Sequence, residues 1–364
     1  ITASLVNELR KRTGVGMMDC KKALVECDGD MDKAIDYLRE KGQKLAAKRA
    51  DRDASEGAVL AAVSQDKTFA AVIMMNCETD FVAKNDEFQG FVEAVANQVV
   101  DSEAADLDAF MAEAWEADTT KTVKDALVEK IAVIGENLNI RRFEKVTADN
   151  GVVVPYIHGG GRIGVLVVAD TDVVNDEIKA ALKNVAMQVA AMNPTYISRN
   201  DISAEELAKL QEITVDAALN DPASLPKPIL NKLIDKAMNS SAWSDEDKAI
   251  YEEKKSNMNY LFNFLSKEAA AALAELAMAD KDAIVSDKIF KGLADGRVSK
   301  QLKEICLLDQ TYVKAEDGKQ TVAKYLESVN KALTIAKVVR FEVGEGMEKK
   351  NEDFAAEVAA QING

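Results

Sequence analysis

The sequence predicts an α+β protein assembled from several small modules. Three observations lead to this prediction: a helical N-terminal stretch, a strand–turn–strand–corner–helix order that occurs twice, and a long helical insertion before a last strand. The chain has 364 residues, which is enough for two to four domains and a substantial buried core.

The N-terminal 52 residues predict a module of three short helices. Thr2 is placed to cap the first helix and Asp30 the third, because both residue types accept hydrogen bonds from the free N–H groups of a first helical turn. We expect Gly42 to end the third helix. Residues 43–57 are polar and basic, and they predict either a linker or a further helix.

The middle of the chain contains a structural repeat. Residues 57–100 and 151–192 both follow the order strand, turn, strand, corner, helix. Two short segments, IRRFEKV at 140–146 and VVRFEVG at 338–344, are similar and strand-like. We therefore expect two related α+β subdomains with small antiparallel sheets, the second completed by a strand from near the C-terminus.

Residues 201–300 predict a helical insertion. Their composition is rich in Ala, Lys, Glu and Leu, and prolines at 222, 226 and 228 separate one helix from the next. The expected apolar seam consists of Leu261, Leu265, Ala272 and Leu276. A packing appendage and an arm that contacts a partner are both open interpretations.

The charge balance limits the kinds of partner. There are 46 Lys and Arg residues against 62 Asp and Glu, a formal net charge of −16. A field of this sign disfavours nucleic acids and anionic membranes as partners. No apolar run approaches the ~20 residues that a membrane helix needs, and the first residues have an amphipathic pattern, not that of a signal peptide.

Cysteine and histidine usage argues against several kinds of chemistry. The cysteines at 20, 27, 77 and 306 include no Cys-x-x-Cys pair, so we expect buried thiols in a reducing cytoplasm, with no zinc site or redox motif. The only histidine, His158, leaves little room for a Ser-His-Asp triad. There is no P-loop either. The sequence therefore predicts no catalytic residue, no metal ligand and no cofactor.

His158 opens a glycine-rich stretch, HGGGRIG. The spacing of its glycines matches a dinucleotide-binding pattern, which requires a helix after the glycines, but a strand-like VLVVAD follows. The HGGG motif in the oxyanion loop of esterases is similar in sequence. Such an esterase also needs a G-x-S-x-G motif for its nucleophile, and the chain has none. We expect a hairpin turn, in which His158 has either a structural polar role or a functional one.

The corner after the strand at 69–75 reads NCETDFVAKNDEF and has two interpretations. Phe81 lies seven residues before Phe88 and could begin a buried helical stripe that continues through Val92, Val95 and Val99. Alternatively, Thr79 is an N-cap and Lys84-Asn85-Asp86 is a second cap signal, which makes residues 79–84 a separate turn and directs Phe81 outward as a protein contact.

Several long motifs in a fixed order together resemble the translation elongation factor Ts family. They are ITASLVNELRKRTGVGMMDCKKAL, NCETDFVAKNDEFQGF, IGENLNIRR, HGGGRIGVLVV and RFEVGEGMEKKNEDFAAEVAAQ. They lie within residues 1–100, 130–200 and 288–361. The family consists of guanine nucleotide exchange factors for the GTPase elongation factor Tu.

The resemblance implies a set of partner-binding residues. Thr79, Asp80, Phe81 and Val82 form the family's wedge, in which Phe81 inserts between helices of the GTPase and disturbs the groups that hold the nucleotide's Mg²⁺. Contact positions on the N-terminal module, which the family builds as a ubiquitin-associated (UBA-like) fold, are Arg10, Met17, Met18 and Lys21. Further contact positions are Ile134, His158 and Val313. The implied partner is elongation factor Tu, with no direct binding of nucleotide, nucleic acid or membrane, and a homodimer within the complex is possible.

The resemblance also completes the domain assignment. The expected parts are a UBA-like module (1–52), a first core subdomain (53–145), a second core subdomain (146–200 with 296–345), a helical or coiled-coil arm (201–295) and a C-terminal module with a helix (346–364). The arm is longer than in the best-known members of the family.

Two other functions compete with nucleotide exchange. A non-catalytic helical adaptor would bind a ubiquitin-like protein through the N-terminal module and use the insertion as a scaffold. A small hydrolase would be built on His158.

Overall fold

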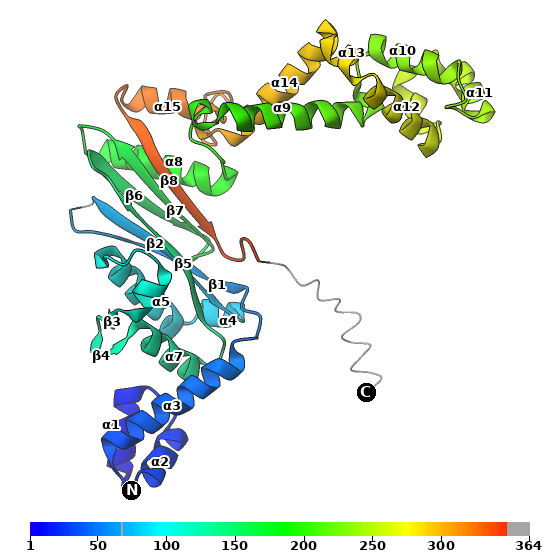
Figure 1. The fold of residues 1–364 in the computed structure, drawn as a ribbon. Coiled ribbons are helices and arrows are strands. Elements are labelled where there is room, and N and C mark those ends of the chain that lie inside the picture. Colours follow the sequence, from blue (N-terminus) through cyan, green and yellow to red (C-terminus); the bar gives the residue numbers. More distant parts are fainter. Residues whose placement is uncertain (67, 348–364) are drawn as a thin grey trace, which may run out of the picture. The chain divides into compact units, whose positions relative to one another are not determined.

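The computed structural model describes residues 1–66 and 68–347, and it confirms the α+β fold class. The chain divides into two compact units (Figure 1). The first unit combines Ile1–Asn193 with the chain from Lys324 onward, and the second is Pro194–Ala323. The second unit contains the whole of the predicted arm and extends beyond it on both sides. The predicted C-terminal helix falls almost entirely outside the described residues.

Three helices form the N-terminal module, as predicted. They are α1 (Ala3–Thr13), α2 (Met17–Glu26) and α3 (Met31–Arg49). The Thr2 hydroxyl accepts a hydrogen bond from the Leu5 N–H, and the Asp30 carboxylate accepts one from the Lys33 N–H, so both predicted caps are confirmed. The helices enclose a small apolar core, made of Val6, Leu9, Cys20, Ala23, Leu24, Ala34 and Leu38.

The prediction that Gly42 ends the third helix is wrong, because α3 continues to Arg49. The residues after Gly42 are strong helix formers, and a single glycine costs only about 1 kcal/mol inside a helix, so the helix continues through it. Gly42 faces Val128 and Ala132 of α7 (Val123–Ile134). Residues 43–49, which the sequence leaves open between linker and helix, are helical.

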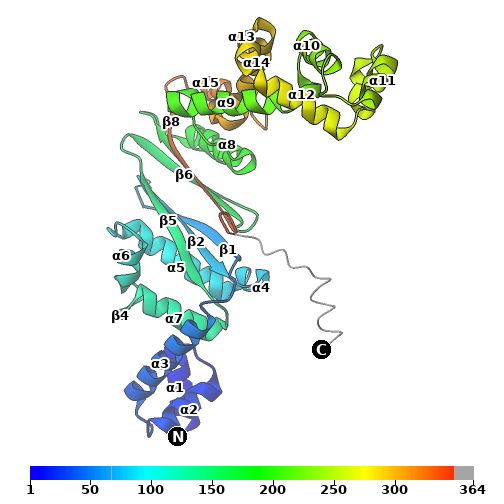
Figure 2. The ribbon, with the colours of Figure 1, turned by 45° about the vertical axis from the view of Figure 1, so that its right-hand side comes forward.

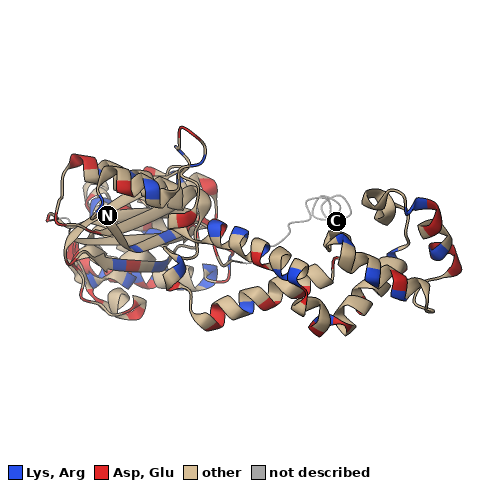
Figure 3. Ribbon diagram, turned by 90° about the horizontal axis from the view of Figure 1, so that it is seen from above, with Lys and Arg blue, Asp and Glu red and all other residues tan. Residues whose placement is uncertain are grey.

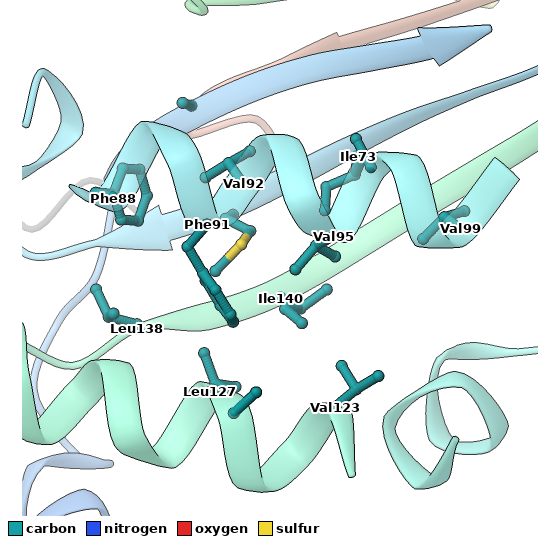
Figure 4. Close-up of a cluster of buried hydrophobic side chains, with 14 of the residues drawn as sticks. Ile73, Phe88, Phe91, Val92, Val95, Val99, Val123, Leu127, Leu138 and Ile140 are labelled. Carbon is teal, nitrogen blue, oxygen red and sulfur yellow. The ribbon is translucent and has the colours of Figure 1, made fainter. Parts of the chain in front are cut away.

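The first sheet has the antiparallel order β1-β2-β5. Its strands are β1 (Glu56–Val63), β2 (Phe69–Cys77) and β5 (Asn139–Thr147). Helices α5 (Asp86–Asp101) and α7 cover one face of it, and a short helix α6 (Leu107–Ala112) and a hairpin, β3 (Ala114–Trp115) with β4 (Asp118–Thr122), lie between them in the chain (Figures 1 and 2). Figure 4 shows the core that they enclose.

The second sheet repeats this arrangement with the order β6-β7-β8. Its strands are β6 (Gly151–His158), β7 (Ile163–Asp170) and β8 (Thr334–Glu342), and α8 (Asp176–Met192) packs on β6 and β7. The last strand comes from near the C-terminus, after α15 (Val322–Val329), as the similarity of 140–146 and 338–344 predicts.

The two sheets share a second core. On β2, alternate residues point to opposite faces: Ile73 and Met75 pack under α5, whereas Val72 and Met74 pack with Leu166 of β7 and other residues of the second sheet. Both faces of β2 are therefore buried. This double burial explains why residues 69–75 form a continuous apolar run with no polar alternation.

The second unit is helical, as predicted for residues 201–300. Prolines 222, 226 and 228 lie at helix starts or in first turns, which confirms their role as separators. The helices are η1 (Arg199–Asp201), α9 (Ala204–Leu219), η2 (Pro222–Ser224), α10 (Lys227–Met238), α11 (Asp245–Lys254), η3 (Met258–Asn263), α12 (Lys267–Ala279), α13 (Lys281–Ser286), α14 (Lys288–Ile305) and η4 (Leu307–Asp309).

The insertion has its own apolar core. Leu261 and Leu265 of the predicted seam are buried in it, and Ala272 and Leu276 pack against it partly exposed, because α12 turns Ala269, Leu273 and Ala277 inward instead. Acidic and basic residues are interspersed along these helices (Figure 3). Within residues 1–66 and 68–347, no helix is long and apolar enough to cross a membrane.

The repeat extends to a backbone detail that supports a stability prediction. Gly57 and Gly151 occupy equivalent positions at the starts of β1 and β6, with φ values of 149° and 150°. A Cβ atom at Gly57 would lie 2.0 Å from the Met75 carbonyl oxygen, and one at Gly151 would lie 2.0 Å from that of Ala169. We expect Gly57→Ala to lower the free energy of unfolding by about 2 kcal/mol or more, measured by chemical denaturation.

Gly90 is the matched control for this prediction. It lies exposed in α5, and no atom lies within 4 Å of the place where its Cβ would be. Gly90→Ala should raise the free energy of unfolding by about 0.5–1 kcal/mol, because alanine restricts the unfolded chain and favours the helix. Equal stability of Gly57→Ala and the parent would mean that the close approach of β1 and β2 does not exist.

Candidate partner-binding site

The corner between β2 and α5 consists of two separately capped helices. Thr79 caps α4 (Asp80–Ala83), its hydroxyl accepting a hydrogen bond from the Val82 N–H at 3.3 Å. Asn85 caps α5, its side-chain oxygen accepting from the N–H groups of Glu87 and Phe88. The prediction of a second cap signal at residues 84–86 is therefore confirmed, and the chain changes direction between the two helices.

This break places Phe81 in water. Its side chain is 83% exposed, whereas Phe88, Val92, Val95 and Val99 are buried beneath α5 (Figure 4). The interpretation of Phe81 as the first member of the buried stripe is therefore wrong. A spacing of seven residues puts two side chains on one face only within an unbroken helix, and the chain from Phe81 to Phe88 is not one helix.

The residues around Phe81 anchor the turn. Val82 packs against the first core, and Ala83 is buried in it. The Gln89 side chain donates a hydrogen bond to the Ala83 carbonyl at 2.5 Å. Asp80 is exposed and lies 3.6 Å from Lys84, so both charges remain available at the surface. The turn therefore holds one large apolar side chain outward on a base that is packed inward.

The N-terminal side of the corner is held by the loop that follows α7. Glu136 accepts hydrogen bonds from the Glu78 N–H at 3.0 Å, the Thr79 N–H at 3.2 Å and the Thr79 hydroxyl at 2.7 Å. Glu78 in turn accepts one from the Asn137 N–H at 2.7 Å. The sequence reasoning missed the roles of Glu78, Glu136 and Asn137. The motif IGEN contains two of them, but nothing in it indicates which segment they reach.

The other predicted contact residues lie on separate elements. Arg10 and Lys21 are exposed on the N-terminal module, with Met17 and Met18 48% and 76% exposed beside them in sequence. Ile134, half-buried, is the last residue of α7 and comes two residues before Glu136. Ile134 therefore directly precedes the segment whose Glu136 and Asn137 hydrogen-bond to residues 78 and 79.

His158 lies in the first unit and Val313 in the second. His158 ends β6, is exposed, and its Nδ1 atom lies 2.9 Å from the Tyr156 hydroxyl. The predicted hairpin turn is confirmed, since β6 and β7 pair on either side of residues 159–162. Val313 is 49% exposed in the second unit. Among the described residues, no group of three or more His, Cys, Asp and Glu side chains could hold a metal ion.

The repeat shows how the corner differs from its counterpart. Asn76 and Asp170 are equivalent, because each pairs with the glycine near the start of the preceding strand. The cap Asn85 lies nine positions after Asn76, whereas the cap Asn175 lies only five after Asp170. The first corner is longer by four residues, which is the length of α4. The helical turn that carries Phe81 is thus an insertion relative to the second copy.

Sequence comparisons agree with this architecture. Residues 78–256 and 244–345 match the family model described as Elongation factor TS. The elongation factor Ts of Clostridium novyi is 41% identical to this chain over 367 aligned residues, which cover 100% of this chain and 99% of that relative. The chain belongs to the elongation factor Ts family. The elongation factor Ts of Trichlorobacter lovleyi is also 41% identical, over 368 aligned residues that cover 99% of this chain and 98% of that relative.

These alignments include both units. Because the relatives in the elongation factor Ts family match over nearly their whole length, the enlarged helical insertion is a feature that the chain shares with them. The N-terminal module precedes the segments that the family model matches, but the full-length relatives cover it. The chain is thus a translation elongation factor by family, and the corner with Phe81 falls inside the matched region.

Cys77 lies directly behind the corner and yields a prediction about thiol reactivity. Burial raises its pKa to about 12, with Glu136 and Glu56 adding to the shift, and its thiol donates to the Thr79 carbonyl at 3.2 Å. A thiol with a raised pKa is protonated at pH 8 and reacts slowly. We expect iodoacetamide at pH 8 to label the half-exposed Cys27 first and to leave Cys77 unlabelled in the folded protein, as measured by peptide mass spectrometry.

Denatured protein is the control for this experiment, because all four cysteines should then react at similar rates. Labelling of Cys77 in the folded protein as fast as that of Cys27 would mean that the base of the corner opens readily to solvent.

Proposed function

We propose that this chain is a guanine nucleotide exchange factor for the GTPase elongation factor Tu. It binds the GDP-bound GTPase, displaces the groups that hold the nucleotide's Mg²⁺, and promotes release of GDP so that GTP can bind. No covalent bond is made or broken, so the factor is not an enzyme. The observation that carries the proposal is Phe81, 83% exposed on an anchored turn.

An exposed aromatic side chain on a fixed turn is suited to entering a partner. Burying a Phe side chain gains about 1.5–3 kcal/mol, and a turn that is already ordered loses little conformational entropy on binding. Asp80 supports the insertion at the surface, and Thr79 and Val82 hold the turn from its two sides. In this proposal Phe81 inserts between helices of the GTPase next to its bound Mg²⁺.

The N-terminal module provides a second contact surface. Met17 and Met18 are exposed on α2, and the cationic Arg10 and Lys21 are exposed on the same module. Flexible methionine side chains adapt to a partner's surface, and nearby cations orient it. We propose that this module docks on the nucleotide domain of the GTPase, with Ile134, His158 and Val313 as further contacts. The factor itself contacts no nucleotide, nucleic acid or membrane, and it acts in the cytoplasm.

Replacing Phe81 tests the wedge directly. We expect Phe81→Ala to slow the release of fluorescently labelled GDP from elongation factor Tu by about 10- to 100-fold at a fixed factor concentration, which corresponds to the ~1.5–3 kcal/mol of a buried Phe. Because the side chain is exposed in the free protein, the thermal melting temperature should not fall.

Phe69 provides the matched control. It is also exposed, at 40%, but it begins β2 at the opposite end of the strand from the corner. Phe69→Ala should leave the exchange rate unchanged. Full activity of Phe81→Ala would refute the wedge.

The repeat offers a sharper test, in which one corner of the chain replaces the other. Substituting residues 171–174, TDVV, for residues 77–84, CETDFVAK, removes the inserted helical turn and keeps a connection that the same fold already uses between β7 and α8. We expect a folded protein, judged by circular dichroism, that no longer accelerates GDP release. A folded chimaera with the parent's exchange rate would show that the corner is not required.

A further inference from the structure

Two carboxylates form a reciprocal brace between the corner and the loop after α7. Glu136 accepts three hydrogen bonds from residues 78 and 79, and Glu78 accepts one from the Asn137 N–H. The two segments lie more than fifty residues apart in the chain. Hydrogen bonds to an ionised carboxylate are stronger than neutral ones, so this brace is a strong long-range constraint on the corner.

The corner needs such a constraint because α4 is only four residues long. A single helical turn is not stable by itself, since the ordering of its backbone costs more than its few hydrogen bonds return. Val82 and Ala83 fix its inner side through packing. Glu136 fixes Glu78 and the N-cap Thr79, which directly precede α4.

The brace extends to the chain that joins the N-terminal module to β1. The buried Asn137 side chain donates a hydrogen bond to the Arg52 carbonyl at 2.8 Å, and the Arg52 guanidinium lies 3.5 Å from Glu78. One cluster of polar contacts thus joins the corner, the end of α7 and the segment after α3. A shift of that segment would reach the corner through Glu78 and Asn137.

We propose that Glu136 is a positioning residue for exchange: its carboxylate holds the Thr79–Val82 turn in the orientation that presents Phe81 to the GTPase. This inference rests on the proposed function, but it names a residue outside the partner-contact set. Glu136 acts through Phe81, without entering the partner itself. Its effect on exchange should therefore exist only while Phe81 is present.

The first test needs no partner. Hydrogen–deuterium exchange of the peptide that covers residues 77–84 reports on the Glu78 and Thr79 amides that Glu136 holds. We expect their exchange to be roughly tenfold faster in Glu136→Ala, the effect of losing one charge-assisted hydrogen bond at each amide. Glu136→Gln should be intermediate, because its one carbonyl oxygen can still accept both N–H groups. Equal protection in parent and Glu136→Ala would overturn the brace.

The second test measures GDP release from elongation factor Tu. We expect Glu136→Ala to lower the maximal release rate by about tenfold, with a smaller change in the half-saturating factor concentration, because the docking surface of the N-terminal module is unaltered. In a Phe81→Ala background, Glu136→Ala should lower the rate by less than about twofold, the signature of coupled residues. Independent, additive effects of the two substitutions would overturn the proposal.

Glu129 supplies the matched control. It lies on α7 and, like Glu136, is half-buried. Its carboxylate pairs with Lys121 of β4 and not with a residue of the corner. Glu129→Ala should change neither the hydrogen–deuterium exchange of residues 77–84 nor the rate of GDP release. Failure of the parent protein to accelerate GDP release would refute the proposed function, whereas normal release by Glu136→Ala would refute only the role of Glu136.

Discussion

An aromatic side chain in water must be kept there by contacts around it, because its burial is favourable wherever the chain can bend to allow it. Phe81 meets this condition through its neighbours. Ala83 and Val82 hold one side of its turn on the core, and Glu136 holds the other through hydrogen bonds to Thr79. The free energy that Phe81 could gain by packing inward is thereby left available for contact with a partner.

The rest of the first unit makes this arrangement rigid. Strand β2 ends at the corner and is buried on both faces, between α5 on one side and the second sheet on the other. A doubly buried strand moves little, so the position of Cys77 at its end is well defined. The second repeat has a sheet and a helix of the same kind, but it lacks the additional helical turn. The structural difference between the two corners thus lies in four residues added to a scaffold that the chain uses twice.

Local patterns in the sequence predicted most of this fold. Caps at Thr2, Thr79 and Asn85, the buried stripe from Phe88 to Val99, and the strand near the C-terminus were all recognisable, because each depends on neighbouring residues or on similarity between the repeats. Gly42 misled because the helix formers that follow it outweigh one glycine.

The candidate site was harder to predict. Spacing alone allowed Phe81 to be buried or exposed, and the question is decided by the separate cap at Asn85 and by packing of Val82. The role of Glu136 was not predictable from sequence patterns, because its partners lie 57 and 58 positions away and no periodicity connects them. Local rules identify elements and caps, whereas contacts that join distant loops require the tertiary structure.

The energetics of exchange explain why such a corner is placed on a large, multi-part protein. In the proposed function, linkage requires the protein to weaken nucleotide binding to the GTPase as many-fold as the nucleotide weakens binding of the protein. A weakening of about 10⁴-fold requires about 5.5 kcal/mol of differential binding, and one Phe side chain supplies about 1.5–3 kcal/mol of it. The remainder has to come from loss of Mg²⁺ coordination in the partner and from other docking surfaces. In the proposed function, exposed methionines on a separate module would add contact area, and a turn fixed before binding would reduce the entropy lost on association.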